Sequence, residues 1–243
     1  MMRLPRFLMQ GDRGMVIEFG QEIHHQYVEQ VRLLMVALEE ARISGVEELI
    51  PTYRSLLVRY QPLRIDFYEL QEKVELLLQE TNRVLAPAFV TDIPVCYDEE
   101  FGPDLMDVAN HAKCTAEEVI QIHTSADYLI YMLGFTPGFP YLGGLSEKIA
   151  CPRLSKPRTA VPAGSVGIAE TQTGIYPLLS PGGWRIIGKT PLRLFDPQIE
   201  PPVLLRAGDY LRFVPISREE YLEISKQVES GFYSAVRRPK EVQ

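Results

Sequence analysis

Apolar residues in the first third of the chain recur with two different periods. Val28, Val31, Met35 and Leu38 share one face of a helix, and Gly45 lies just beyond its end. A second helix is predicted to begin at Asp66, with Glu69 placed for a capping box. Short strand-like runs at 7–9, 14–19, 48–53 and 55–60 flank the two helices. The order ββαββα predicts a small α+β domain in which both helices cover one sheet.

Strand signals dominate the rest of the chain. Strand patterns occur at 93–97 and 128–133, and a hairpin is predicted between 203–206 and 210–214. Three helices are predicted here: one at 103–112, one that begins at the capping box of Thr115, and one at 221–229. Many short strands joined by Gly and Pro turns indicate a closed or nearly closed β-barrel. We therefore expect an N-terminal domain at 1–90 and a barrel domain with a short C-terminal helix at 91–243, with the boundary near 87–94.

The stretch from Gly134 to Asp196 differs from its surroundings in composition and in charge. It holds ten of the chain's 17 glycines and eight of its 19 prolines, which indicates tight turns between short strands. It carries a net charge of +4, whereas the whole chain carries −7. A cationic region of many turns in an acidic protein is a candidate site for an anion.

The composition narrows the class of protein. The 243 residues are 46% hydrophobic and 23% charged, as in a soluble globular protein. The net negative charge argues against a protein that binds nucleic acid, and no apolar run reaches the length of a membrane span. The N-terminal residues lack the long apolar stretch of a signal peptide, so we expect a cytoplasmic protein. Cys96, Cys114 and Cys151 have neither a disulfide framework nor a metal-binding spacing, and no metal site is predicted from the residues.

One segment matches the Walker A pattern letter for letter: Gly183-Trp-Arg-Ile-Ile-Gly188-Lys189-Thr190. A phosphate loop needs flexible loop positions and a helix that starts directly after them. Here Trp184, Arg185, Ile186 and Ile187 favour a strand, and Pro191 follows at once. We therefore interpret the match as accidental and predict a strand, with Lys189 still free to meet an anion at the barrel rim.

Within the cationic stretch, three cations occur within six residues, and two prolines stiffen the segment that holds them. Arg153, Lys156 and Arg158 are suited to binding carboxylates or phosphates, although a solvated turn would show the same pattern. Polar side chains that can donate or accept hydrogen bonds follow at Ser165, Gln172, Tyr176 and Ser180. Trp184, the only Trp, adds a flat apolar surface. Together they predict a small-ligand pocket, the alternative being that they cap barrel turns. The candidate anion- or substrate-binding residues are Arg153, Arg158, Ser165, Gln172, Tyr176, Ser180, Trp184 and Lys189.

His123 is the one candidate catalytic residue, at the end of the helix that starts near Thr115. Its side chain could act as a general base, since histidine titrates near neutral pH. A core or helix-terminal histidine is the other account, because no neighbour in the sequence orients the ring. Both accounts stay open at this point.

The central stretch resembles the bacterial family of the 5-oxoprolinase B subunit, also labelled Kip-type sensor-kinase inhibitor and allophanate hydrolase subunit 1. It is also similar to subdomains C and D, the first half of the carboxyltransferase domain of urea carboxylase. The resemblance extends from Gly11 to Ile216. It rests on these motifs: Tyr131-Met-Leu-Gly-Phe-Thr-Pro-Gly-Phe-Pro-Tyr-Leu-Gly143, Pro152-Arg153, Pro157-Arg158, Val161-Pro-Ala-Gly-Ser165, Gln172-Thr-Gly-Ile-Tyr-Pro177, Ser180-Pro-Gly-Gly-Trp184, Gly188-Lys-Thr-Pro191 and Phe195-Asp-Pro197.

The resemblance implies a small α+β domain followed by a cyclophilin-like β-barrel. It also implies two partners, the C subunit of 5-oxoprolinase, which has a similar barrel, and its A subunit. The assembled enzyme would open 5-oxo-L-proline to L-glutamate with ATP as co-substrate and Mg²⁺ accompanying it. Arg153, Arg158 and Lys189 would attract the substrate carboxylate or a phosphoryl group. The alternative that the resemblance implies is a binding module that inhibits a sensor histidine kinase through the barrel domain.

Overall fold

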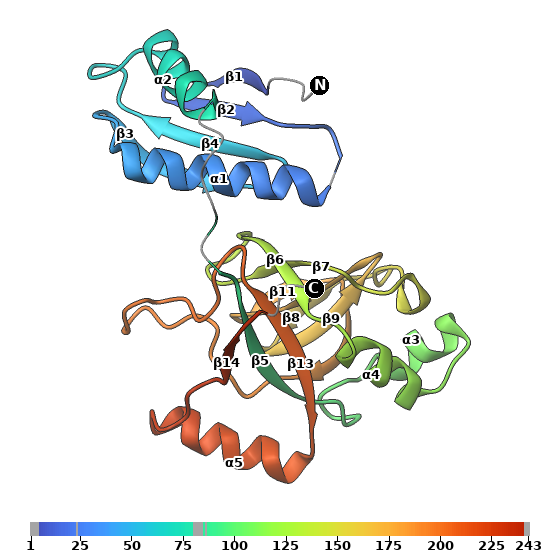
Figure 1. Cartoon of the computed structure of the whole chain (residues 1–243). Helices are drawn as coiled ribbons and strands as arrows, with labels where there is room; N and C mark the ends of the chain where they lie inside the picture. Colours follow the sequence, from blue (N-terminus) through green and yellow to red (C-terminus); the bar gives the residue numbers. More distant parts are fainter. Residues whose placement is uncertain (1–4, 23, 80–84, 86, 241–243) are drawn as a thin grey trace. The chain divides into compact units, whose positions relative to one another are not determined.

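The computed structural model describes residues 5–22, 24–79, 85 and 87–240. The chain divides into two compact units, Met1–Ala86 and Pro87–Gln243 (Figure 1). None of the helices in these described ranges combines the length and the apolar character that a membrane span requires.

The first unit is a four-stranded antiparallel sheet in the order β1-β2-β4-β3, packed against two helices. Its elements are β1 (Arg6–Gln10), β2 (Gly14–Glu18), α1 (His25–Ala41), β3 (Val46–Pro51), β4 (Ser55–Tyr60) and α2 (Phe67–Gln79). Alternation along the strands decides which face is buried: Met15 and Ile17 of β2 pack into one core with Leu34 of α1 and Leu70 of α2. This unit confirms the predicted ββαββα order.

The start of α2 shows how local sequence fixes an element. The carboxylate of Asp66 accepts hydrogen bonds from the backbone amides of Tyr68 at 2.8 Å and Glu69 at 2.9 Å. These amides have no partner inside the helix, so the aspartate satisfies them and sets the first turn.

The second unit is a barrel-like eight-stranded sheet. Along the sheet the strands run β10-β9-β12-β5-β13-β6-β7, and β14 adds to β5. The two end strands, β7 and β10, lie against each other, so the barrel is nearly closed. Its strands are β5 (Phe89–Cys96), β6 (Tyr128–Leu133), β7 (Pro140–Gly143), β9 (Ser165–Ala169), β10 (Gln172–Ile175), β12 (Arg185–Lys189), β13 (Tyr210–Ile216) and β14 (Arg237–Pro239). The predicted α+β class, an α+β unit followed by a β-barrel, is confirmed.

Smaller elements surround the barrel (Figure 1). They are α3 (Leu105–Ala112), α4 (Ala116–Thr124), the short helix η1 (Glu147–Ile149), the two-stranded sheet of β8 (Arg158–Val161) and β11 (Ser180–Gly182), and α5 (Arg218–Glu229). The predicted capping box of α4 is present: the Thr115 hydroxyl accepts from the Glu118 amide, and the Glu118 carboxylate accepts from the Thr115 amide. Ser217 and Glu220 form a second box at α5.

The predicted hairpin between 203–206 and 210–214 is wrong. β13 instead pairs in parallel with β5 and antiparallel with β6. Residues 192–195 and 203–206 form no regular strand. They meet at an isolated bridge between Phe195 and Val203, beside which the Leu204 amide donates to the Leu194 carbonyl at 2.9 Å. Four prolines, at 191, 197, 201 and 202, lie beside these segments, and each lacks the amide donor that a ladder needs.

Candidate functional site

An aromatic cluster lies at the centre of the cationic stretch. The ring of Phe139 meets four others edge-on, with centroid distances of 5.6 Å to Trp184, 5.7 Å to Tyr176, 5.3 Å to Tyr141 and 5.8 Å to Phe135. Phe139, Tyr176 and Trp184 are buried, whereas Phe135 is 69% exposed. We call these five residues the aromatic cluster.

Glycine residues leave the space that the rings of the aromatic cluster occupy. A Cβ on Gly182 would lie 2.2 Å from the Tyr176 hydroxyl oxygen, and one on Gly174 would lie 3.0 Å from the Trp184 ring. Both positions are too close for a methyl group to fit without rearrangement. The glycines that the sequence places here are therefore needed for close packing rather than only for turns.

Phe135 has an unusual backbone. Its φ is +68°, in the left-handed region that bulky residues rarely adopt. The loop around it is hydrogen-bonded, from the Gly134 amide to the Phe139 carbonyl at 3.1 Å and from the Phe139 amide to the Thr136 carbonyl at 3.1 Å. Residues held in sparsely populated backbone conformations cluster at active sites, ligand clamps and switch regions, so Phe135 is a candidate functional position.

Two arginines reach the aromatic cluster in different ways. The Arg153 guanidinium lies over the Trp184 ring, 5.8 Å from its centroid, and Arg153 is exposed. Within the described part of the chain, no carboxylate forms an ion pair with Arg153. Arg158 instead donates to Oδ1 of Asp104 at 2.7 Å. Arg153 is thus available to an anion, and Arg158 is already paired.

The pairing of Arg158 belongs to a structural network. Asp104 is buried, and its Oδ2 accepts from the Ile186 backbone amide at 2.7 Å. Hydrogen bonding to Asp104, partly opposed by burial, raises the pKa of Arg158 and keeps it charged. Arg185 pairs with Asp107 of α3 at 2.6 Å, so α3 neutralises a second cation of the stretch.

The other predicted residues do not all join this group. Ser165 in β9 is buried and pairs in register with Lys189 in β12. Lys189 lines a hollow of about 190 Å³ with Thr190, Arg193 and residues of α5. Ser180 in β11 donates to the Leu178 carbonyl, and Gln172 begins β10. The structure therefore brings together Arg153, Arg158, Tyr176 and Trp184. Ser165 adjoins this group through its backbone, because its carbonyl accepts from the Tyr176 amide at 2.9 Å, whereas Lys189 lines the separate hollow.

The Walker-like segment is a strand. Residues 185–189 form β12, which pairs with β9, and no helix follows Thr190. This confirms the strand prediction. In the described ranges, no three His, Cys, Asp or Glu side chains are grouped to hold a metal ion.

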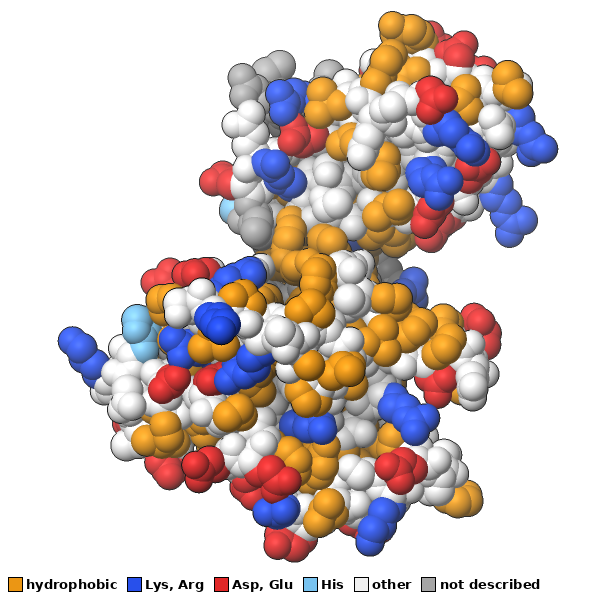
Figure 2. Space-filling model, turned by 180° about the vertical axis from the view of Figure 1, so that it is seen from behind, with side chains coloured by type: hydrophobic (Ala, Val, Ile, Leu, Met, Phe, Trp, Pro, Cys, Tyr) orange, Lys and Arg blue, Asp and Glu red, His pale blue; other side chains and the backbone are white. Residues whose placement is uncertain are grey.

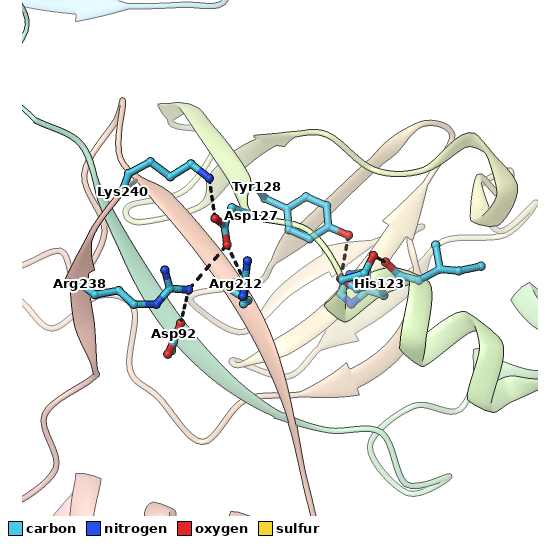
Figure 3. A network of polar contacts seen from close by, with 9 residues as sticks. Asp92, His123, Asp127, Tyr128, Arg212, Arg238 and Lys240 are labelled. Carbon is cyan, nitrogen blue, oxygen red and sulfur yellow. Dashed lines mark hydrogen bonds and ion pairs between the residues drawn. The ribbon is translucent and has the colours of Figure 1, made fainter. Parts of the chain in front are cut away.

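His123 lies inside the barrel core. Its Nδ1 is 2.8 Å from the Tyr97 hydroxyl, its Nε2 is 2.9 Å from the Thr173 hydroxyl, and its ring stacks on Phe213. The Tyr128 hydroxyl donates to the His123 backbone carbonyl at 2.8 Å (Figure 3). Complete burial lowers the pKa of His123 from 6.5 to about 3. This geometry favours the core histidine over the general base.

Two groups of contacts were absent from the sequence-based account. The partners of His123, Tyr97 and Thr173, are 26 and 50 residues away along the chain. Asp104, the partner of Arg158, is separated from it by 54 residues. Tyr176 and Trp184 were predicted to belong to the pocket, but their edge-on packing against Phe139 was not predicted.

Hydrophobic and charged side chains intermingle on the surface of the second unit (Figure 2). Its exposed large apolar residues include Phe135, Leu179, Ile199 and Phe232. Exposed aromatic residues are enriched in the cores of protein interfaces, so Phe135 is a candidate contact for another chain.

Comparison with known proteins places the chain in a family. Residues 5–205 match the family model described as carboxyltransferase domain, subdomain C and D. The chain is 48% identical over 227 residues to the 5-oxoprolinase B subunit of Bacillus subtilis, a match that covers 87% of this chain and 92% of that protein. It is 38% identical over 214 residues to the Escherichia coli O157:H7 protein of the same name, covering 88% and 97%.

A solved structure shows the same fold at low identity. The Kluyveromyces lactis urea carboxylase matches with a TM-score of 0.77 and 20% identity, over 96% of this chain and 24% of that chain. This likeness concerns the fold alone. From the family match and the identities to the two bacterial relatives, the chain belongs to the family of the 5-oxoprolinase B subunit, within the carboxyltransferase domain, subdomain C and D.

Proposed function

We propose that this chain is the B subunit of an ATP-dependent 5-oxoprolinase, which converts 5-oxo-L-proline to L-glutamate together with the A and C subunits. The relatives that carry the B-subunit name support the role of one component in a hydrolase complex. The observation that carries the proposal is Arg153, an exposed cation that is stacked over Trp184 and forms no ion pair with a described carboxylate.

The substrate has the features that this face can bind. 5-Oxo-L-proline is a small lactam ring with one carboxylate. A guanidinium binds a carboxylate through two parallel hydrogen bonds, and the neighbouring aromatic cluster offers an apolar surface for the ring. Water must be added across an unstrained amide that resonance stabilises, so coupling to ATP hydrolysis would supply the driving force.

The described residues do not fit a self-contained ATP and Mg²⁺ site. The one segment with a phosphate-loop pattern is the strand β12, and the described ranges hold no group of three or more His, Cys, Asp or Glu side chains placed for a metal ion. We therefore assign ATP and Mg²⁺ to the other two components of the enzyme, and no chemical step is assigned to them on this chain.

Partner chains would complete the site. Phe135 is the candidate contact, because its ring is exposed while its backbone is held in a strained conformation. A stable complex is expected to bury at least about 1,000 Å² in total.

Reconstitution tests the proposal. This chain would be co-expressed with the A and C subunits, and glutamate release from 5-oxoproline would be measured with and without ATP. We expect ATP-dependent release by the mixture and none by this chain alone. Glutamate release by this chain alone, or no release by a mixture that co-elutes, would overturn the proposal.

A matched pair of variants tests the contact surface. Phe135→Ser is expected to weaken co-elution with the C subunit, whereas Phe232→Ser, which changes an even more exposed ring of the same unit, should not. Equal behaviour of the two variants would remove Phe135 from the interface.

A further inference from the structure

The last described strand, β14, is added to an edge of β5. It pairs antiparallel with register Arg237 to Thr91, Arg238 to Val90 and Pro239 to Phe89. Two backbone hydrogen bonds frame it, from the Asp92 amide to the Val236 carbonyl at 2.9 Å and from the Lys240 amide to the Ala88 carbonyl at 2.8 Å. β12 pairs with β5 only at Cys96, at the other end of β5, so β14 covers an edge that β12 leaves open.

Three cations of this segment meet three aspartates of the barrel. Lys240 donates to Asp127 at 2.6 Å, and Arg238 approaches Asp92 at 3.4 Å (Figure 3). Arg237 donates to Asp209 at 2.8 Å. The aspartates come from separate parts of the barrel: Asp92 lies in β5, Asp127 precedes β6 and Asp209 precedes β13. The charges are therefore complementary, basic on the strand and acidic on its receptor.

The receptor is held in place by contacts of its own. Asp209 also accepts from the Phe89 backbone amide at 3.1 Å, and Asp127 also accepts from Arg212 at 2.6 Å. The side chains of Asp127 and Asp209 are only 9% and 10% exposed. The contacts with Phe89 and Arg212 do not involve β14, so they would hold Asp209 and Asp127 in place without the strand.

The strand itself buries little apolar surface. Arg237 and Pro239 are exposed, and the side chains of Arg237, Arg238 and Lys240 are 48%, 38% and 28% exposed. Arg237 lies over the Phe89 ring at 4.0 Å and Lys240 over the Tyr210 ring at 5.0 Å, which are again charge-dependent contacts. The cations of these pairs are partly exposed, whereas Asp127 and Asp209 are nearly buried, so salt weakens the pairs only in part. Because β14 adds little apolar burial to these contacts, it should open at lower cost than the inner strands of the sheet.

We propose that β14 is a detachable ionic strap, and that the groove it fills, the β5 edge between Asp92, Asp127 and Asp209, is a strand-addition site for a basic extended segment. An open strand edge supplies affinity through backbone hydrogen bonds, and side-chain contacts supply selectivity. The three aspartates would select cations, and in the free chain the protein's own C-terminal segment occupies the groove. This inference does not depend on the proposed enzymatic role.

Hydrogen exchange of the full chain tests the strap. Raising NaCl to about 1 M, where the screening length falls to about 3 Å, should speed exchange of the Asp92 and Lys240 amides by at least about tenfold. The Ile130 amide, which donates to the Asp209 carbonyl inside the sheet, should be unaffected. Unchanged protection of Asp92 in high salt would overturn the ionic strap.

Variants extend the same test to low salt. A triple variant (Arg237→Gln, Arg238→Gln, Lys240→Gln) should show fast Asp92 exchange at low salt. The control Arg218→Gln, which removes an exposed arginine of α5 that pairs with Glu100, should leave Asp92 exchange slow. A triple variant with full Asp92 protection would show that the charges do not hold the strand.

A peptide tests the groove. A labelled peptide of residues 234–240, SAVRRPK, should bind the triple variant at low salt, and fluorescence anisotropy can measure it. Wild type should bind it at least about tenfold more weakly because its own strand fills the groove, and a peptide with both arginines and the lysine replaced by glutamine should not bind. A triple variant whose Asp92 amide exchanges quickly and which still fails to bind SAVRRPK would overturn the strand-addition site.

Discussion

Arg158 and Asp104, separated by 54 residues, are joined by a hydrogen bond of 2.7 Å between guanidinium and carboxylate. The aspartate is almost completely buried, and its other oxygen holds the Ile186 amide of β12. Asp104 therefore links the start of α3 both to Arg158 and to β12, the strand that follows Trp184. Arg153, only five residues earlier, has no such carboxylate in the described part of the chain, so the two arginines should respond differently to substitution.

We expect Arg158→Ala to lower stability. The change leaves the Asp104 carboxylate with the Ile186 amide but without its counter-ion, in a position that water hardly reaches. The free energy of unfolding should fall by roughly 2 kcal/mol, the usual scale for a lost hydrogen bond to a charged group. Urea denaturation measures it, and Arg158→Lys should recover part of the loss. Unchanged stability would show that the ion pair is dispensable.

Arg153→Ala should instead reduce activity of the assembled enzyme and spare the fold. Because its guanidinium is exposed and stacked on Trp184, removing it takes away one charge-assisted contact with substrate. Such a contact is typically worth about 1.5–3 kcal/mol, or roughly a tenfold to hundredfold loss in kcat/KM. Lys156→Ala, an exposed cation of the same turn, is the control and should retain activity. Full turnover by Arg153→Ala would remove the anion site.

The sequence predicted local features better than distant ones. The helices of the first unit followed from apolar spacing, and the capping box at Thr115 and the Asp66 cap followed from residue type, because both depend on neighbours in the chain. The strand at 185–189 followed from β-branched and aromatic residues at positions where a phosphate loop needs flexibility.

Distant pairings could not be inferred in this way. The hairpin prediction at 203–206 failed because β13 found its partners in β5 and β6, which lie far away in the sequence. For the candidate site, the sequence grouped all the cations of the stretch as one. In the folded chain, Asp104 pairs with Arg158 and Asp107 pairs with Arg185, so these two cations are already neutralised. The sequence alone does not reveal these pairings, because the partners are far apart along the chain.

Lys189→Ala should leave the affinity of the isolated chain for ATP unchanged. Lys189 ends the strand β12, and no helix N-terminus follows it to bind a phosphate. Calorimetry with ATP and Mg²⁺ should show no binding by either wild type or variant. Magnesium-dependent binding by wild type that Lys189→Ala abolishes would show that the segment is a phosphate site.

His123 should make the fold sensitive to acid. Its pKa in the folded chain is about 3, because burial excludes the charged ring, whereas an exposed histidine titrates near 6.5. The unfolded chain therefore binds a proton at this residue before the folded chain does. The contribution of neutral His123 to stability is complete above about pH 6.5 and is lost as the pH falls toward 3. From about pH 7.5 to about pH 5, the free energy of unfolding should fall by roughly 2 kcal/mol from this group, at 1.36 kcal/mol per pH unit below 6.5. Urea denaturation at the two pH values measures the difference, which His123→Gln should remove and the exposed His111→Gln should keep. A fall of equal size in the His123→Gln variant would assign the acid sensitivity to other groups.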